Sequence, residues 1–249
     1  MTSLGRFLVP MVVGAAMTLP LDLAAQGSGD GFLFRAPRIQ LGFRVGYAGA
    51  TAGSEIFDFS REELTLEKGD FSGGLFGAEV AYRASERLDL ALAFSNSSTR
   101  TRSEFRDWIG EDDLPIEQET TFIRRPFTVS ARYFFSDRGR AVSRFAWIPN
   151  RMTPYLGGGV GVMWYEFTQD GDFVDFQDLA IFTTRFNSDG TSLMGHVLGG
   201  LELSVSPRIV ANLEGRYEFA SAEMSQDFVG FDDIDLSGFQ VSVGLGLRF

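Results

Sequence analysis

The stretch GFQVSVGLGLRF (238–249) alternates between apolar residues and residues that are polar or very small. Its apolar positions are Phe239, Val241, Val243, Leu245, Leu247 and Phe249. A period of two is typical of a β-strand that presents one apolar face. Such a face needs either a protein core or lipid to cover it.

Seven other stretches show the same period of two. They are 39–48, 75–83, 87–94, 127–135, 155–164, 193–205 and 208–219. The sequence therefore predicts eight strands. Long polar links are expected at 50–70, 96–121, 167–190 and 220–237, with short links between the other strands. Alternating short turns and long loops are typical of a transmembrane β-barrel. The link 136–151 is long for the short-turn end, and the pattern suggests only that Phe145 and Trp147 lie at an interface.

Composition narrows the possible functions. The chain has 249 residues and a formal net charge of −11, which argues against binding of nucleic acid. It has no cysteine, so disulfides and thiolate metal sites are excluded. Residues 1–25 are predicted to be a cleaved signal peptide, because Arg6 precedes a short apolar run that ends before Ala24 and Ala25. We expect a short periplasmic N-terminal segment at 26–36 and a barrel at 37–249.

A soluble β-sandwich or lipocalin-like barrel would also alternate. The predicted signal peptide, the aromatic residues near strand ends and the apolar final strand favour a membrane barrel. Because lipid offers no hydrogen bonds to an open sheet edge, the sheet must close, with the final strand beside the first.

The final strand resembles the insertion signal of bacterial outer-membrane proteins, with Val243, Leu245, Leu247 and Phe249 at the matching positions. The chain as a whole resembles the small eight-stranded outer-membrane barrels: the OmpA transmembrane domain, OmpW and the opacity-type porins. The resemblance implies an all-β antiparallel up-and-down barrel in the bacterial outer membrane, with both termini in the periplasm. It also implies contact with membrane lipid, lipopolysaccharide and the barrel-insertion machinery. It brings no catalytic motif, and no periplasmic domain is expected after the eighth strand.

If the apolar faces point outward, a set of charged residues points into the lumen. The set is Arg38, Arg44, Glu79, Arg83, Asp89, Arg132, Glu202, Arg208, Glu214, Arg216, Glu218 and Arg248. The near balance of signs predicts a paired network. A lumen of eight strands is just wide enough for its own side chains. The favoured interpretation is a plugged barrel with a structural or surface-contact role, and the alternative is a narrow channel for small solutes. Arg38, Arg83, Arg132, Arg208 and Arg248 are expected to form a basic rim at the periplasmic mouth, with a weak preference for anions.

Other chemistry has less support in the sequence. His196 is the only histidine, and Ser192 shares its predicted face, which leaves a lipid-acting enzyme as a third hypothesis. The default is a polar lumen histidine, no catalytic residues and no cofactor. The acidic stretches 167–179 and 228–236 suggest divalent cations or, as the simpler alternative, a solvated acidic surface. The glycines of GGGVG (157–161) are interpreted as positions where neighbouring groups approach closely, not as a phosphate loop.

Overall fold

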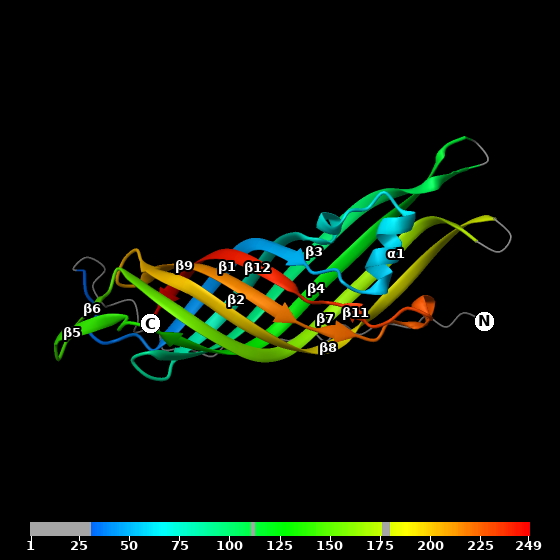
Figure 1. The fold of residues 1–249 in the computed structure, drawn as a ribbon. Coiled ribbons are helices and arrows are strands. Elements are labelled where there is room, and N and C mark those ends of the chain that lie inside the picture. Colours follow the sequence, from blue (N-terminus) through cyan, green and yellow to red (C-terminus); the bar gives the residue numbers. More distant parts are fainter. Residues whose placement is uncertain (1–30, 111–112, 176–179) are drawn as a thin grey trace, which may run out of the picture.

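The computed structural model describes residues 31–110, 113–175 and 180–249 (Figure 1). The predicted signal peptide lies outside the described residues. Eight antiparallel strands form a closed ring in the order β1-β12-β9-β8-β7-β4-β3-β2. The ring strands are β1 (Ile39–Ala50), β2 (Gly73–Arg83), β3 (Leu88–Ile109), β4 (Pro115–Phe134), β7 (Met152–Val174), β8 (Ile181–Ser204), β9 (Ile209–Phe219) and β12 (Gly238–Arg248). The predicted eight-stranded up-and-down barrel is confirmed, and the final strand does pair with the first, with Val45 opposite Val243.

Shorter elements fill the connections. They are α1 (Glu55–Glu63), the 3-10 helices η2 (Lys68–Phe71) and η3 (Gln226–Phe228), and the strand pairs β5 (Gly139–Ser143) with β6 (Ala146–Pro149) and β10 (Ser221–Ala222) with β11 (Ile234–Asp235). Within the described part of the chain, no helix is long and apolar enough to cross a membrane.

Four neighbouring strands extend beyond the rest of the barrel. The strands β3, β4, β7 and β8 have 22, 20, 23 and 24 residues, whereas the other four have 11 or 12. Figure 1 shows them projecting from one end, and we call this part of the molecule the extension. The prediction of loops at 96–121 and 167–190 is therefore largely wrong, since most of these residues are in strands.

The polarity of the alternation reverses between the barrel and the extension. In the lower part of β4, Val129 faces outward and Arg132 faces inward. In its upper part the exposed residue is Glu117 and the buried ones are Ile116 and Phe122. The strand keeps its period, but apolar residues change from the outer to the inner face. This reversal is expected where a barrel wall leaves lipid and enters water, because only the outer face in lipid must be apolar.

The inner face of the extension holds an apolar core. Phe57 of α1 is fully buried, with its ring centroid 4.7 Å from Phe71, 5.5 Å from Phe122 and 5.8 Å from Phe167. Phe228 of η3 packs against Phe167 from the other covering loop at 5.6 Å. The two loops at 51–72 and 220–237 therefore cover the interior of the extension, and their apolar residues are buried there.

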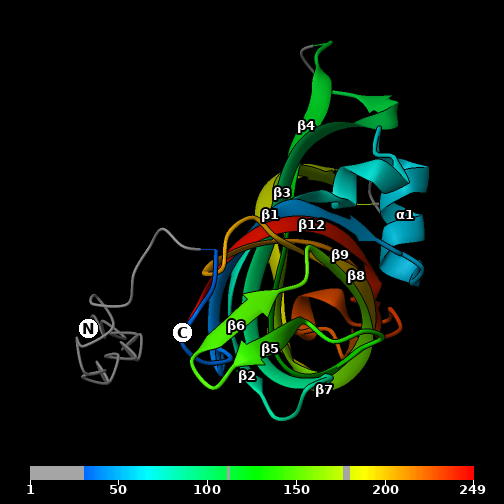
Figure 2. The same cartoon turned by 90° about the vertical axis from the view of Figure 1, so that its left-hand side faces the viewer.

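The opposite end of the barrel carries the β5–β6 hairpin, which lies across the ring opening in Figure 2. Trp147 of this hairpin pairs through its backbone with Leu33 and is buried, whereas Phe145 is exposed. The hairpin accounts for the long 136–151 link. Trp147 was expected at an interface; its ring packs inward against Arg83 and Arg248 and is covered by them.

The outer surface of the barrel is a continuous apolar band. Its exposed residues include Phe43, Val45, Val80, Leu92, Val129, Val160, Leu193, Leu213, Val243 and Leu245. Exposed aromatic residues flank the band: Tyr47, Phe94, Phe127, Trp164, Phe219 and Phe239 near the extension, and Tyr82, Tyr133, Phe135 and Phe249 near the hairpin. An apolar band between two aromatic girdles is the surface of a barrel that spans a lipid bilayer.

Candidate functional site

The lumen is crossed by a buried network centred on Glu214 of β9. Its carboxylate accepts hydrogen bonds from Arg44 (3.1 Å), Arg216 (3.0 Å) and the Tyr155 hydroxyl (3.0 Å), and it lies 3.1 Å from Arg132. These side chains come from β1, β4, β7 and β9, so a single carboxylate connects opposite walls of the ring. Its lone pairs are fully used, as a buried carboxylate requires.

Arg132 extends the network to β2. Its guanidinium donates two parallel hydrogen bonds to Glu79, at 2.7 and 2.6 Å, and its face lies 5.4 Å from the Tyr155 ring centroid. This two-pronged pairing is the geometry that arginine provides and lysine cannot. Nearly all basic residues of the chain are arginine, and the paired hydrogen bonds in the lumen use the geometry of its side chain.

A second layer of ion pairs lies nearer the hairpin end. Arg138 donates two hydrogen bonds to Asp89, at 2.6 and 2.7 Å, and Arg248 pairs with Glu202. Because Arg138 belongs to the link between β4 and β5, the pair also fastens the hairpin to the barrel wall.

Ten of the twelve residues predicted to face the lumen are buried in it. They are Arg44, Glu79, Arg83, Asp89, Arg132, Glu202, Glu214, Arg216, Glu218 and Arg248. The two others lie at the mouth near the hairpin, where the basic rim was expected. Arg38 is exposed before β1, and Arg208 is half-exposed in the β8–β9 turn, because both precede their strands and so lie at the mouth and not inside it. Arg132 was expected on the rim but lies deeper, where Glu79 and Glu214 hold it.

Three important residues were not identified from the sequence. Tyr155 faces inward by strand parity, which would have revealed it. Arg124 is buried and donates to the main-chain oxygens of Leu236 (3.3 Å) and Ser237 (3.4 Å), but it lay between the predicted link 96–121 and the predicted strand 127–135. Arg138 lies outside any ring strand, so no periodicity could have placed it.

The suggested pairing of His196 with Ser192 does not occur. The Nε2 of His196 lies 2.8 Å from the Ser130 hydroxyl, and the Ser192 hydroxyl donates to the main-chain oxygens of Ser221 and Leu193 (3.0 Å). Residues four apart on a strand share a face but are separated by about 13 Å, so they cannot be in contact. His196 and Ser130 are both buried in the lumen.

The acidic residues of the extension mostly fix one segment to another. Asp235 accepts from the Gly53 amide (3.1 Å), Asp232 accepts from the Glu55 amide (3.0 Å), and Thr183 donates to Asp172 (2.5 Å). The described residues contain no group of three or more carboxylate or histidine side chains arranged to hold a metal ion. Of the two alternatives for the acidic stretches, the divalent-cation site has no support in the described residues; Asp178 lies outside them.

A small cavity lies beside the central network. It measures about 20 Å³ and is bordered by Arg44, Glu79, Tyr155 and Glu214. Such a volume holds about one water molecule. The lumen is therefore filled at this level, with the apolar core of the extension on one side and the hairpin on the other.

Comparisons with known proteins found similarity among solved structures. No family model matches the chain, and no curated protein matches it. Among solved structures, Neisserial surface protein A is 16% identical (88% of this chain, 98% of that chain, TM-score 0.48). The attachment invasion locus protein Ail of Yersinia pestis is 15% identical (85% and 99%, TM-score 0.46). The outer membrane protease OmpT of Escherichia coli is 13% identical (89% and 99%, TM-score 0.42).

The chain's own geometry defines its class. A closed ring of eight antiparallel strands, an apolar outer band with aromatic girdles and a polar interior make it a small membrane-spanning β-barrel of the outer-membrane type. Within that class, its distinguishing features are the ion-paired lumen, the extension and the hairpin.

Proposed function

We propose that this protein is a non-conducting barrel of a bacterial outer membrane, which holds the extension at the cell surface for contact with other molecules. The observation that supports this function best is the network on Glu214, which ties four strands together across the lumen. A path for solutes would require several buried ion pairs to separate at once. Breaking one such pair costs about 3–5 kcal/mol.

Closure is tested by solute uptake into vesicles that contain the refolded barrel. The expected result is that sugars and amino acids enter no faster than into empty vesicles, while a general porin prepared in the same way admits them. Uptake above the empty-vesicle rate would favour the alternative function, a narrow channel in which arginine–glutamate pairs exchange partners.

We propose that the extension faces the cell exterior and that the β2–β3 turn, the β5–β6 hairpin and both chain termini face the periplasm. Short turns at one end and long connections at the other support this orientation. In this arrangement the band contacts membrane lipid, and the extension lies beside lipopolysaccharide. Val243, Leu245, Leu247 and Phe249 face outward, where the insertion machinery would meet the final strand during assembly.

The orientation is testable because the natural chain has no cysteine. A cysteine at Asp113, in the exposed tip between β3 and β4, should react on intact cells with a maleimide polymer too large for porins. A cysteine at Ser143, exposed in the hairpin, should react only after the outer membrane is permeabilised. The opposite pattern would contradict the orientation.

We propose no catalytic role. His196 and Ser130 are enclosed by the network, and a reaction would need substrate to reach them. An enzymatic activity lost specifically in His196→Ala, with the barrel still folded, would contradict this proposal.

A further inference from the structure

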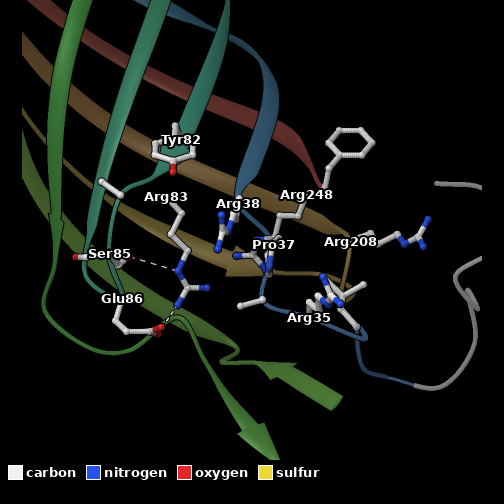
Figure 3. A pocket seen from close by; sticks show the side chains of 13 residues that line it. Arg35, Pro37, Arg38, Tyr82, Arg83, Ser85, Glu86, Arg208 and Arg248 are labelled. Atoms are coloured by element: carbon white, nitrogen blue, oxygen red, sulfur yellow. Dashed lines mark hydrogen bonds and ion pairs between the residues drawn. The ribbon is translucent and has the colours of Figure 1, made fainter. Parts of the chain in front are cut away.

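An open pocket of about 790 Å³ lies at the hairpin end of the barrel (Figure 3). Its walls come from the segment before β1, the β2–β3 turn, the β8–β9 turn and the end of β12. Its basic side chains are Arg35, Arg38, Arg83, Arg208 and Arg248. The one acidic side chain in its wall is Glu86. Basic groups therefore outnumber acidic groups in the pocket wall.

The arginines of the pocket are only partly neutralised. Arg83 pairs with Glu86, and Arg248 pairs with Glu202. Arg35 and Arg38 are exposed and form no ion pair with any residue that the structure describes. Arg208 extends outward from the pocket in Figure 3, so the site does not depend on it. The main-chain oxygen of Phe249 accepts hydrogen bonds from the backbone amides of Arg38 (2.7 Å) and Ile39 (3.2 Å). This oxygen is therefore occupied by backbone pairing.

Arg83 is the arginine of the pocket whose side chain is buried and held in place by its neighbours. Its side chain is 7% exposed, and its Nε donates to the main-chain oxygen of Ser85 (3.4 Å). Its Nη1 has no hydrogen-bond partner in the described part of the chain. The guanidinium also packs 5.8 Å from the Trp147 ring centroid, so the hairpin fixes its position. A buried guanidinium nitrogen without an acceptor is costly, and an anion would supply one.

We propose that this pocket binds a phosphate group, with Arg83 at its base and Arg35 and Arg38 at its entrance. Guanidinium groups bind phosphate through paired, charge-assisted hydrogen bonds, which fits a cluster of arginines better than any neutral ligand would. Tyr82 and Phe249 form another part of the wall and belong to the aromatic girdle. The pocket therefore borders both the membrane interface and the aqueous space. The phosphate can come from an anionic lipid headgroup or from a soluble phosphate compound.

The test uses Trp147 as a reporter, because it contacts both Arg83 and Arg248. The mature chain carrying Trp108→Phe and Trp164→Phe is refolded into phosphatidylcholine nanodiscs, which leaves one tryptophan. In the first arm, sodium phosphate is added and compared with sodium chloride at equal ionic strength. In the second arm, the nanodiscs contain phosphatidylglycerol in place of part of the phosphatidylcholine.

The decisive variant is Arg35→Gln with Arg38→Gln. Its matched control is Arg140→Gln with Arg144→Gln, which removes the same charge from exposed positions of the hairpin, outside the pocket wall. We expect phosphate to shift Trp147 emission, with the dissociation constant raised about tenfold or more in the pocket variant and unchanged in the control. A gel shift on heating verifies that every variant is folded.

The two arms distinguish the sources of the phosphate. An emission shift with phosphatidylglycerol that depends on Arg35 and Arg38 identifies a lipid headgroup. A shift with soluble phosphate alone identifies an aqueous ligand. The proposal is overturned if neither probe shifts the emission. It is also overturned if the pocket and control variants respond equally, because the effect would then be general attraction to a basic surface.

Discussion

At the scale of single residues, Glu214 is the centre of the lumen network. Three arginines surround its carboxylate, and its negative charge offsets their mutual repulsion. The Tyr155 hydroxyl completes its set of partners. Removing the negative charge would leave buried positive charges in mutual repulsion, without water to screen them.

We predict that Glu214→Gln lowers the free energy of unfolding by about 3–5 kcal/mol, the range for breaking one partner of a buried ion pair. Urea titration of the barrel in lipid vesicles measures the change. The matched control is Glu117→Gln on the exposed face of the extension, with an expected change within about 0.5 kcal/mol. Equal effects of the two substitutions would show that Glu214 does not organise the lumen.

Glycines in β7 allow a second prediction. A Cβ at Gly159 would lie 1.9 Å from the Val129 main-chain oxygen and 2.9 Å from His196 Cε1, whereas a Cβ at Gly195 of the paired strand meets nothing within 4 Å. We expect Gly159→Ala to destabilise the barrel by at least about 1–3 kcal/mol through overpacking. Gly195→Ala should be nearly neutral in the same urea titration. A neutral Gly159→Ala would contradict the close packing of β7 against β4.

Strand parity was enough to predict which charged residues face inward, as at Arg44, Glu79 and Glu214. It could not predict which residues pair. Arginine side chains span several ångströms, so Arg132 binds Glu79 and Glu214 although its register partner on β3 is Asp89. Asp89 is bound instead by Arg138. Because Arg138 belongs to no ring strand, the alternation of a strand could not predict where its side chain points.

At the scale of elements, the β5–β6 hairpin covers the mouth of the barrel opposite the extension. It is fixed by the backbone pairing of Trp147 with Leu33, by the Arg138–Asp89 ion pair and by the stacking of Trp147 against two arginines. Of these contacts, the stacking of the Trp147 ring can be removed by truncating one apolar side chain. Trp147 is therefore the position to test.

We predict that Trp147→Ala releases the hairpin while the barrel stays folded. Loss of a buried tryptophan side chain costs about 3–5 kcal/mol, so trypsin cleavage after Arg140 and Arg144 should accelerate about 100-fold or more. Val142→Ala, at an exposed hairpin position, is the control and should leave the rate unchanged. Unchanged cleavage in Trp147→Ala would mean that the tryptophan does not anchor the hairpin.

The elements also show where sequence patterns stop being informative. Within the bilayer, an apolar outer face is required on every strand, and the period of two was easy to recognise. In the extension the same strands have water outside and the covering loops inside. The apolar residues therefore occupy the inward-facing positions there instead of the outward-facing ones. Phe122 of β4 and Phe167 of β7 mark this change, and neither fell within a predicted strand. The hairpin was missed because its strands are only five and four residues long.

At the scale of the whole molecule, charge is separated between the two ends. The covering loop with α1 is rich in acidic residues, whereas the hairpin and the pocket beside it are rich in arginine. The net charge of −11 is therefore concentrated in the extension. Three layers lie between the ends: the apolar core, the network on Glu214 and the hairpin held by Trp147. The closed lumen is the central claim, because every proposal of a surface role depends on it.

Single-channel recording of the refolded mature barrel in a planar bilayer tests that claim most directly. Folding is verified beforehand by the shift in gel mobility on heating. A closed lumen predicts a silent membrane under conditions in which a general porin, inserted in the same way, gives clear current steps. Steady, salt-dependent openings that change in Arg44→Ala or Glu214→Ala would contradict it and identify a conducting lumen.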